Sequence, residues 1–173
     1  SEDATEQTFE NTSSQVTATG TNQITINPGS DLDSSTEYYV LIDATSFDDA
    51  SGNSYAGITD TKALSFTTAD IGTPTLDSSS PTDNSTAVAV DSNIILNFSE
   101  AVDVETGNII IKKTSDDATV ETIDITSSQV TGTGTNQITI NPGSDLDSST
   151  EYYVLIDATS FDDASGNSYA GIT

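Results

Sequence analysis

The residues from Ser13 to Thr59 are repeated almost letter for letter from Ser127 to Thr173. The single difference is Ala18 in the first copy against Gly132 in the second, and the copies start 114 residues apart, at positions 13 and 127. Such a period is the size of a whole domain, whereas solenoid repeats run to roughly 20 to 50 residues. The sequence therefore predicts self-contained domains in tandem, with one full period and about half of another present.

The amino-acid composition favours an all-β fold. Hydrophobic residues make up 33% of the chain, and Cys, Met, Trp and His are absent. The core must therefore be built from Val, Ile, Leu, Phe and Tyr, which favour strands, while the Gly, Asn, Asp and Ser between them favour turns. Because cysteine is absent, disulfides do not contribute to the stability of this chain.

The chain is also strongly acidic. It carries 28 Asp and Glu residues against three Lys, which gives a formal net charge of −25 at pH 7. This self-repulsion destabilises a compact state unless cations neutralise it, and it excludes nucleic acid and anionic membrane surfaces as partners. No apolar run reaches the roughly 20 residues of a membrane span, so we expect no membrane insertion. The acids indicate a solvated acidic surface, divalent cation sites, or both.

Alternation of apolar and polar residues predicts short strands along one period. Residues 93–98 are the clearest case, because Ile94, Leu96 and Phe98 fall on one face. About seven short strands without a helix fit a Greek-key β-sandwich. The other expected strands are residues 73–76, 87–90, 108–112, 120–126, 137–141, 152–157 and 63–68.

Tyr152 stands at the start of a late strand, with Leu146 six residues upstream. This spacing suits the tyrosine corner of immunoglobulin-like (Ig-like) sandwiches, in which the hydroxyl bonds to the backbone a few residues upstream. The same spacing recurs at Leu32 and Tyr38. The pattern predicts one corner in each copy, and the alternative interpretation of each tyrosine is a plain strand aromatic.

Four phrases of the period, taken in order, carry a family resemblance. They run from Ser79 to Thr86, from Asn93 to Val102, from Asp163 to Asn167 and from Ser65 to Thr68. Together they resemble the bacterial Ig-like tandem repeats of large secreted adhesins of the RTX and biofilm type. The resemblance covers the whole period. It implies Ig-like Greek-key β-sandwiches in extracellular arrays at the bacterial surface, often stiffened by calcium, and it implies no particular ligand.

We expect the boundary between repeats at Asp70. Residues 1–70 would be the C-terminal part of one Ig-like repeat without its first strands, and residues 71–173 the next repeat without its final strand. Three arrangements would fill the gaps: a longer array, a circularly permuted domain over residues 1–114, or strand donation between neighbouring chains. An open sandwich exposes an unpaired edge, so an isolated monomer is expected to aggregate.

Calcium is the expected cofactor, because Ca²⁺ takes six to eight oxygen ligands, which this chain has in excess. In such a sandwich three segments share one end: the loop after the second strand (Glu100, Asp103, Glu105), the loop before the last strand (Asp162, Asp163, Asn167) and the incoming linker. The preceding domain presents the loop before its own tyrosine corner to that junction. The alternatives are an Asx-type turn for residues 162–167 and a local cap for Asp31 and Asp33. The predicted ligands are Asp31, Asp33, Asp48, Asp49, Asp70, Glu100, Asp103, Asp162, Asp163 and Asn167.

The residue types also constrain the function. Because His, Cys and Arg are absent and only three Lys are present, we do not expect an enzyme. The favoured interpretation is a structural spacer of a secreted surface adhesin or extracellular fibre, with neighbouring repeats or neighbouring chains as partners. Near-identical copies favour the spacer, because a binding surface is needed only once, whereas the length of an array grows with the number of copies. The alternatives are a carbohydrate- or protein-binding β-sandwich module and a self-assembling filament subunit joined by strand exchange.

Overall fold

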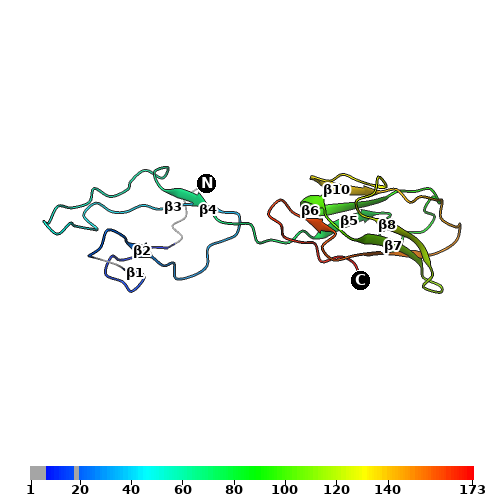
Figure 1. The fold of residues 1–173 in the computed structure, drawn as a ribbon, viewed down its shortest axis with the longest axis horizontal. Coiled ribbons are helices and arrows are strands. Elements are labelled where there is room, and N and C mark those ends of the chain that lie inside the picture. Colours follow the sequence, from blue (N-terminus) through cyan, green and yellow to red (C-terminus); the bar gives the residue numbers. More distant parts are fainter. Residues whose placement is uncertain (1–6, 18–19) are drawn as a thin grey trace. The chain divides into compact units, whose positions relative to one another are not determined.

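The computed structural model describes residues 7–17 and 20–173, so Ala18, where the first copy departs from the second, lies outside the described residues. The chain divides into two compact units, Ser1–Asp70 and Ile71–Thr173, called unit 1 and unit 2 below. Every helix or strand assigned within the described residues is a β-strand (Figure 1). The all-β prediction is therefore confirmed.

The first sheet of unit 2 is organised around one long strand, β6. Two strands pair with it along opposite edges, and both run antiparallel to it. A third, very short strand pairs with its C-terminal end, and a fourth extends the sheet beyond the first of the two partners, β10. These strands are β6 (Ile94–Val104), β10 (Thr135–Ile140), β5 (Leu76–Ser80), β12 (Phe161–Asp162) and β9 (Val130–Thr131).

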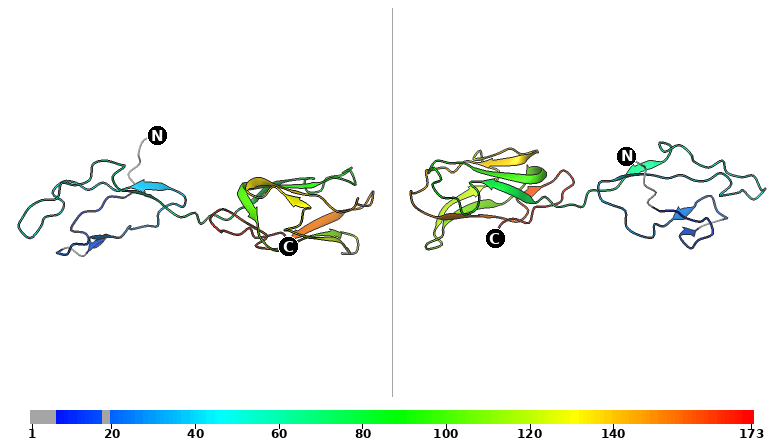
Figure 2. Two further views of the ribbon diagram at one scale, coloured as in Figure 1. Left: turned by 45° about the horizontal axis from the view of Figure 1, so that its top comes forward. Right: turned by 180° about the vertical axis from the view of Figure 1, so that it is seen from behind.

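The second sheet of unit 2 contains three antiparallel strands in the order β11-β7-β8. They are β11 (Tyr152–Ile156), β7 (Asn108–Lys113) and β8 (Thr119–Asp124). β7 follows β6 after a short connection, but the two strands lie in different sheets. Figure 2 shows the two sheets of unit 2 as two layers.

Aliphatic and aromatic side chains fill the space between the two sheets. Leu96 and Phe98 of β6 are buried, as their alternation predicts, and Ile109 and Ile111 of β7 are fully buried from the other sheet. A β-sandwich is stabilised in this way, because alternate residues of both sheets point inward. The other buried apolar members are Val102, Ile123, Ile125, Val130, Ile138, Ile140, Ile156, Phe161 and Tyr169.

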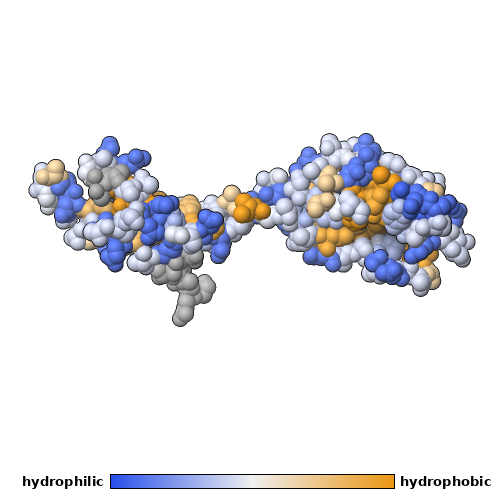
Figure 3. Space-filling model, turned by 90° about the horizontal axis from the view of Figure 1, so that it is seen from below, coloured by the Kyte–Doolittle hydropathy of each residue, from blue (hydrophilic) through white to orange (hydrophobic). Residues whose placement is uncertain are grey.

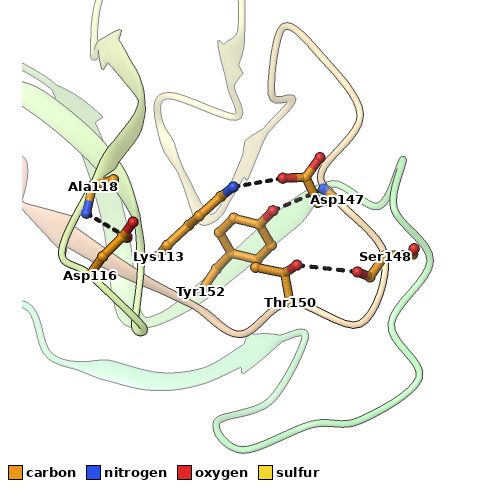
Figure 4. A network of polar contacts seen from close by, with 7 residues as sticks. All are labelled: Lys113, Asp116, Ala118, Asp147, Ser148, Thr150 and Tyr152. Carbon is orange, nitrogen blue, oxygen red and sulfur yellow. Dashed lines mark hydrogen bonds and ion pairs between the residues drawn. The ribbon is translucent and has the colours of Figure 1, made fainter.

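The tyrosine corner is present in both units. The hydroxyl of Tyr152 accepts a hydrogen bond from the backbone N–H of Asp147 at 2.9 Å, and Tyr38 accepts one from Asp33 at the same distance. In unit 2 the corner also includes an ion pair, in which Lys113 Nζ lies 2.7 Å from Asp147 Oδ2 (Figure 4). This contact lowers the pKa of Asp147 and raises that of Lys113. The corner predicted from the sequence is confirmed in both copies.

Replacing Tyr152 with phenylalanine is expected to lower the free energy of unfolding of unit 2 by about 1 kcal/mol, because one hydrogen bond is lost while the ring is kept. Tyr153→Phe is the matched control, since its hydroxyl makes only an exposed contact with Asp117. Urea denaturation of the full chain measures the difference. Equal effects of the two substitutions would show that the corner does not stabilise unit 2.

Unit 1 repeats the later strands of unit 2 in a sparser form. It contains two separate two-stranded sheets, one formed by β1 (Val16–Thr17) and β2 (Thr25–Ile26), the other by β3 (Glu37–Tyr39) and β4 (Ser65–Thr67). Val16 is the single buried apolar residue among its described residues. Identical sequence is therefore much less buried in unit 1, whose described residues contain no strands equivalent to β6 and β7.

Three local expectations for unit 2 are corrected. The strand expected at residues 73–76 begins only at Leu76 and runs to Ser80. No strand forms at residues 87–90, because Ala87 adopts a left-handed backbone with φ 59° that interrupts extension. Glu100 and Asp103 do not lie in a loop after the second strand, since β6 continues to Val104 through its pairing with β12.

Candidate functional site

The predicted ligands of unit 2 gather at the end of the sandwich where β12 meets β6. Asp162 lies directly opposite Asp103 in the antiparallel register. Like charges that face each other across a strand pair destabilise the pair. Glu100 and Asp163 form a second pair, with carboxylate oxygens within 4.8 Å of each other. Four carboxylates are thus concentrated on two short stretches of strand and the turn that follows.

The carboxylate of Asp162 includes a buried oxygen, Oδ1, that has no hydrogen-bond partner within the described structure. Its partner in the register, Asp103, accepts a hydrogen bond from the Thr133 hydroxyl at 3.1 Å. A buried charged oxygen without a partner costs free energy. A hard cation held between Asp103 and Asp162 would remove both the repulsion and the unsatisfied oxygen. The donor set of this pair therefore fits Ca²⁺.

Asp163 is 5% exposed and organises a tight turn. Its Oδ1 accepts hydrogen bonds from the backbone N–H groups of Ser165 and Asn167, and its Oδ2 accepts one from the Asn167 side-chain amide, each at 2.8 Å. The Asn167 side chain is the main cause that lowers the pKa of Asp163, so this carboxyl is ionised at neutral pH. The bonds occupy three of about four lone-pair sites. The Asx-type turn is therefore present, and it already uses most of the acceptor capacity of the Asp163 carboxylate.

The chain enters unit 2 at the same end. Thr75 N–H donates to Ser99 Oγ at 3.0 Å, and Ser99 N–H donates to the Thr75 carbonyl at 2.9 Å. Glu100 follows Ser99 directly in β6. The structure therefore places Glu100 beside the segment through which the chain enters unit 2.

Three predicted ligands of unit 1 lie near the point where the chain leaves that unit. The Ser34 hydroxyl donates to Asp70 Oδ1 at 3.3 Å and to the Ala69 carbonyl at 3.2 Å. Asp33 precedes Ser34, and Asp31 is exposed in the same loop. The loop before the tyrosine corner is therefore held against the last residues of unit 1.

Asp48 and Asp49 lie at the other end of unit 1. Asp49 repeats the turn seen in unit 2, with Oδ1 accepting from Asn53 N–H and Oδ2 from the Asn53 side-chain amide, both at 2.8 Å. The Asn53 side chain again is the main cause that lowers the pKa of Asp49. β3 lies between the loop that holds Asp31 and Asp33 and this turn, and the structure does not bring the four carboxylates together.

Thr133 contributes to the acidic end although the sequence did not single it out. It reaches Asp103 because the loop between β9 and β10 folds over β6, where Gly134 N–H donates to the Val102 carbonyl at 2.8 Å. The local signal is a threonine between two glycines, which predicts a loop and says nothing of its distant contact.

The fold agrees with the comparisons with known proteins. A family model described as a bacterial Ig-like domain matches residues 2–68 and again residues 70–173. The comparisons with curated proteins and with solved structures gave no match. Domains of this family occur in bacterial surface or extracellular proteins. In the described part of the chain no helix has the length and hydrophobicity needed to cross a membrane. With two matches that span nearly all of its sequence, the chain belongs to the bacterial Ig-like domain family.

Proposed function

We propose that this chain is a spacer segment of a secreted bacterial surface adhesin or extracellular fibre, in which tandem Ig-like repeats hold a distal binding region away from the cell. The near-identity of residues 13–59 and 127–173 carries the proposal. A second copy of the same domain lengthens the array, whereas binding a specific ligand requires only one binding surface. The proposal assigns no catalytic activity to the chain, and its partners are neighbouring repeats of the array.

Calcium is proposed to stiffen the array at the acidic end of unit 2. The opposed Asp103 and Asp162, with the unsatisfied Oδ1 of Asp162, support one position. Glu100 and Asp163 support a second. Asp70 directly precedes Ile71, the first residue of unit 2, and is proposed as a further ligand. A cation that joined the linker to the sandwich would restrict bending between repeats.

Adding calcium is expected to stabilise unit 2. With affinities of about 10⁻⁴ to 10⁻³ M and roughly 10 mM calcium, each occupied site adds about 1.4 to 2.7 kcal/mol to the free energy of unfolding. Thermal melting of the full chain in calcium and in a chelator measures this change. Identical melting temperatures in the two buffers would refute calcium binding.

The effect of Asp162→Asn on the stability of unit 2 is expected to have opposite signs in the two buffers. In chelator it stabilises unit 2, because the repulsion with Asp103 is removed, and in calcium it loses a large part of the calcium-dependent stabilisation. Asp91→Asn is the matched control, because it removes one exposed charge just before β6, at the end of that strand opposite the acidic end. If both variants keep the same calcium response, Asp103 and Asp162 do not hold the ion.

The spacer role itself is tested with proteins of two, four and eight repeats in small-angle scattering. The maximum dimension is expected to grow in proportion to repeat number in calcium and to grow less in chelator. A globular shape whose dimension levels off with repeat number would contradict a spacer.

A further inference from the structure

Unit 2 contains an open cleft at the end of the sandwich where β6 begins. The loop of residues 81–93 forms most of its wall, and the last residue of β5 and the second residue of β6 complete it. Its volume is about 490 Å³, within the range of about 300 to 1,000 Å³ that is typical of ligand sites. None of the residues that line it is charged, although charged residues make up 18% of the chain. The cleft is therefore a neutral depression on a strongly acidic protein.

Backbone contacts hold both sides of the cleft in place. Ser80 and Ile95 lie directly opposite each other in the pairing of β5 with β6. The loop is fixed near its other end, where Leu146 N–H donates to the Val90 carbonyl at 2.9 Å. Between these points Ala87 adopts a left-handed backbone with φ 59°, which bends the loop. A cleft with fixed walls is available to a ligand without the cost of ordering the chain.

The interior of the cleft includes apolar side chains. Pro81 and Ile95 are partly buried, whereas Val88 is 42% exposed. Apolar side chains also reach the surface of unit 2 elsewhere, and Figure 3 shows hydrophobic atoms among hydrophilic ones on the face seen from below. Val120 of β8, for example, is 41% exposed. Exposure alone therefore does not mark a site, and Val88 is distinguished by its place in a concave surface.

Polar side chains with unused hydrogen-bonding capacity accompany the apolar ones. Within the described residues, four side chains that line the cleft make no hydrogen bond to the protein. They are those of Ser80, Thr86, Ser92 and Asn93. Three hydroxyls and one amide provide donors and acceptors without net charge. A ring that presents C–H groups on its faces and hydroxyls at its edges, as a pyranose does, matches both sets of side chains.

The charges around the cleft disfavour ionic ligands of both signs. Asp83 and Asp91 belong to the same loop but do not line the cleft, so a cation would find no carboxylate within it. An anion would be repelled by these two acids and by the net charge of −25. We infer that the cleft binds a neutral oligosaccharide.

This site is separate from the acidic end of unit 2. β6 begins at the cleft and reaches Asp103 only next to its last residue, Val104. The cleft therefore gives unit 2 a binding activity in addition to the spacer role, and the inference does not depend on that role.

The test is a titration of the ¹⁵N-labelled full chain in chelator, followed by ¹H–¹⁵N NMR spectra. The probes are the neutral tetrasaccharides cellotetraose, maltotetraose and N-acetylchitotetraose, each added to roughly 10 mM, where a site with a dissociation constant of about 1 mM is mostly occupied. At least one probe is expected to shift the amide signals of residues 80–95, a sequence that occurs once in the chain. The amide signals of β12 should not move. Tetragalacturonate, which carries a carboxylate on every ring, is expected to give no shift.

Two substitutions at surface valines give a matched comparison. Val88→Asp is expected to weaken binding about tenfold or more, because it places an unpaired charge against the bound sugar. Val120→Asp makes the same change at a residue of nearly equal exposure outside the cleft, and it should leave the affinity unchanged. Asn93→Ala, which adds no charge, is expected to weaken binding about 2- to 10-fold through the loss of a hydrogen bond.

The absence of shifts at residues 80–95 with all of the neutral probes would overturn the inference. Equal binding of tetragalacturonate would overturn the assignment of a neutral ligand. An affinity that is the same for Val88→Asp as for Val120→Asp would show that the cleft is not the site. None of these outcomes bears on the calcium or spacer proposals, since the measurement is made in chelator and does not depend on the length of an array.

Discussion

Replacing Phe161 with alanine is expected to lower the free energy of unfolding of unit 2 by about 3 to 5 kcal/mol. The ring is fully buried, and its centroid lies 5.2 Å from that of Phe98 and 6.4 Å from that of Tyr169. Truncation removes these contacts and leaves a cavity between the two sheets. Hydrogen exchange of β6 and β7 amides measures the loss, since their sequence occurs once in the chain.

The duplicated sequence supplies the control. Phe47 is the counterpart of Phe161 with the same neighbours in sequence, but it is only partly buried in unit 1. Phe47→Ala is expected to leave the exchange of β6 and β7 unchanged. If Phe161→Ala cost less than about 1 kcal/mol, the sandwich core described for unit 2 would be wrong.

This pair of substitutions shows why part of the fold was predictable and part was not. The tyrosine corners were found from the sequence because Tyr152 and Asp147 are five residues apart, and the interaction is local. The burial of Leu96 and Phe98 followed from alternation in the same way. The difference between Phe47 and Phe161 has no local signal, because it depends on β6 and β7 being present.

The candidate site shows the same difference between local interactions and contacts that depend on distant strands. The turn formed by Asp163 and Asn167 was the alternative interpretation of these residues, and it could be read from the sequence because its hydrogen bonds span at most four residues. The pairing of Asp103 with Asp162 across the two strands was not predicted, because it depends on how far β6 continues before it ends. A shift of one residue in that register would send the two carboxylates to opposite faces of the sheet. The pairing register between β6 and β12, which brings the carboxylates of the acidic end together, therefore could not be predicted from the sequence.

The ion pair between Lys113 and Asp147 was missed for a related reason. The two residues are distant in sequence and meet only because β7 lies beside β11. With three lysines against 28 acids, composition suggests that each lysine has many possible partners. The sheet order selects one of them and places it at the tyrosine corner.

The Gly132→Ala substitution, which copies the residue of the first repeat into the second, is expected to destabilise unit 2 by about 3 kcal/mol or more. Gly132 has φ 105°, and a Cβ built on it would lie 2.1 Å from the Gln137 carbonyl oxygen. Backbone strain at such a position costs about 1 to 3 kcal/mol, and overpacking against fixed atoms adds about 1 to 3 kcal/mol. Relief requires the loop between β9 and β10 to open, which would also move Thr133 away from Asp103.

Gly166→Ala separates the two causes. Gly166 has φ 83°, but a Cβ there would meet nothing within 4 Å, so only the strain of about 1 to 2 kcal/mol applies. Exchange of β6 and β7 amides again reports the stability of unit 2. If the two substitutions cost the same, the carbonyl of Gln137 does not constrain the loop. A larger cost for Gly132→Ala would mean that the one difference between the copies lies where the second copy tolerates only glycine.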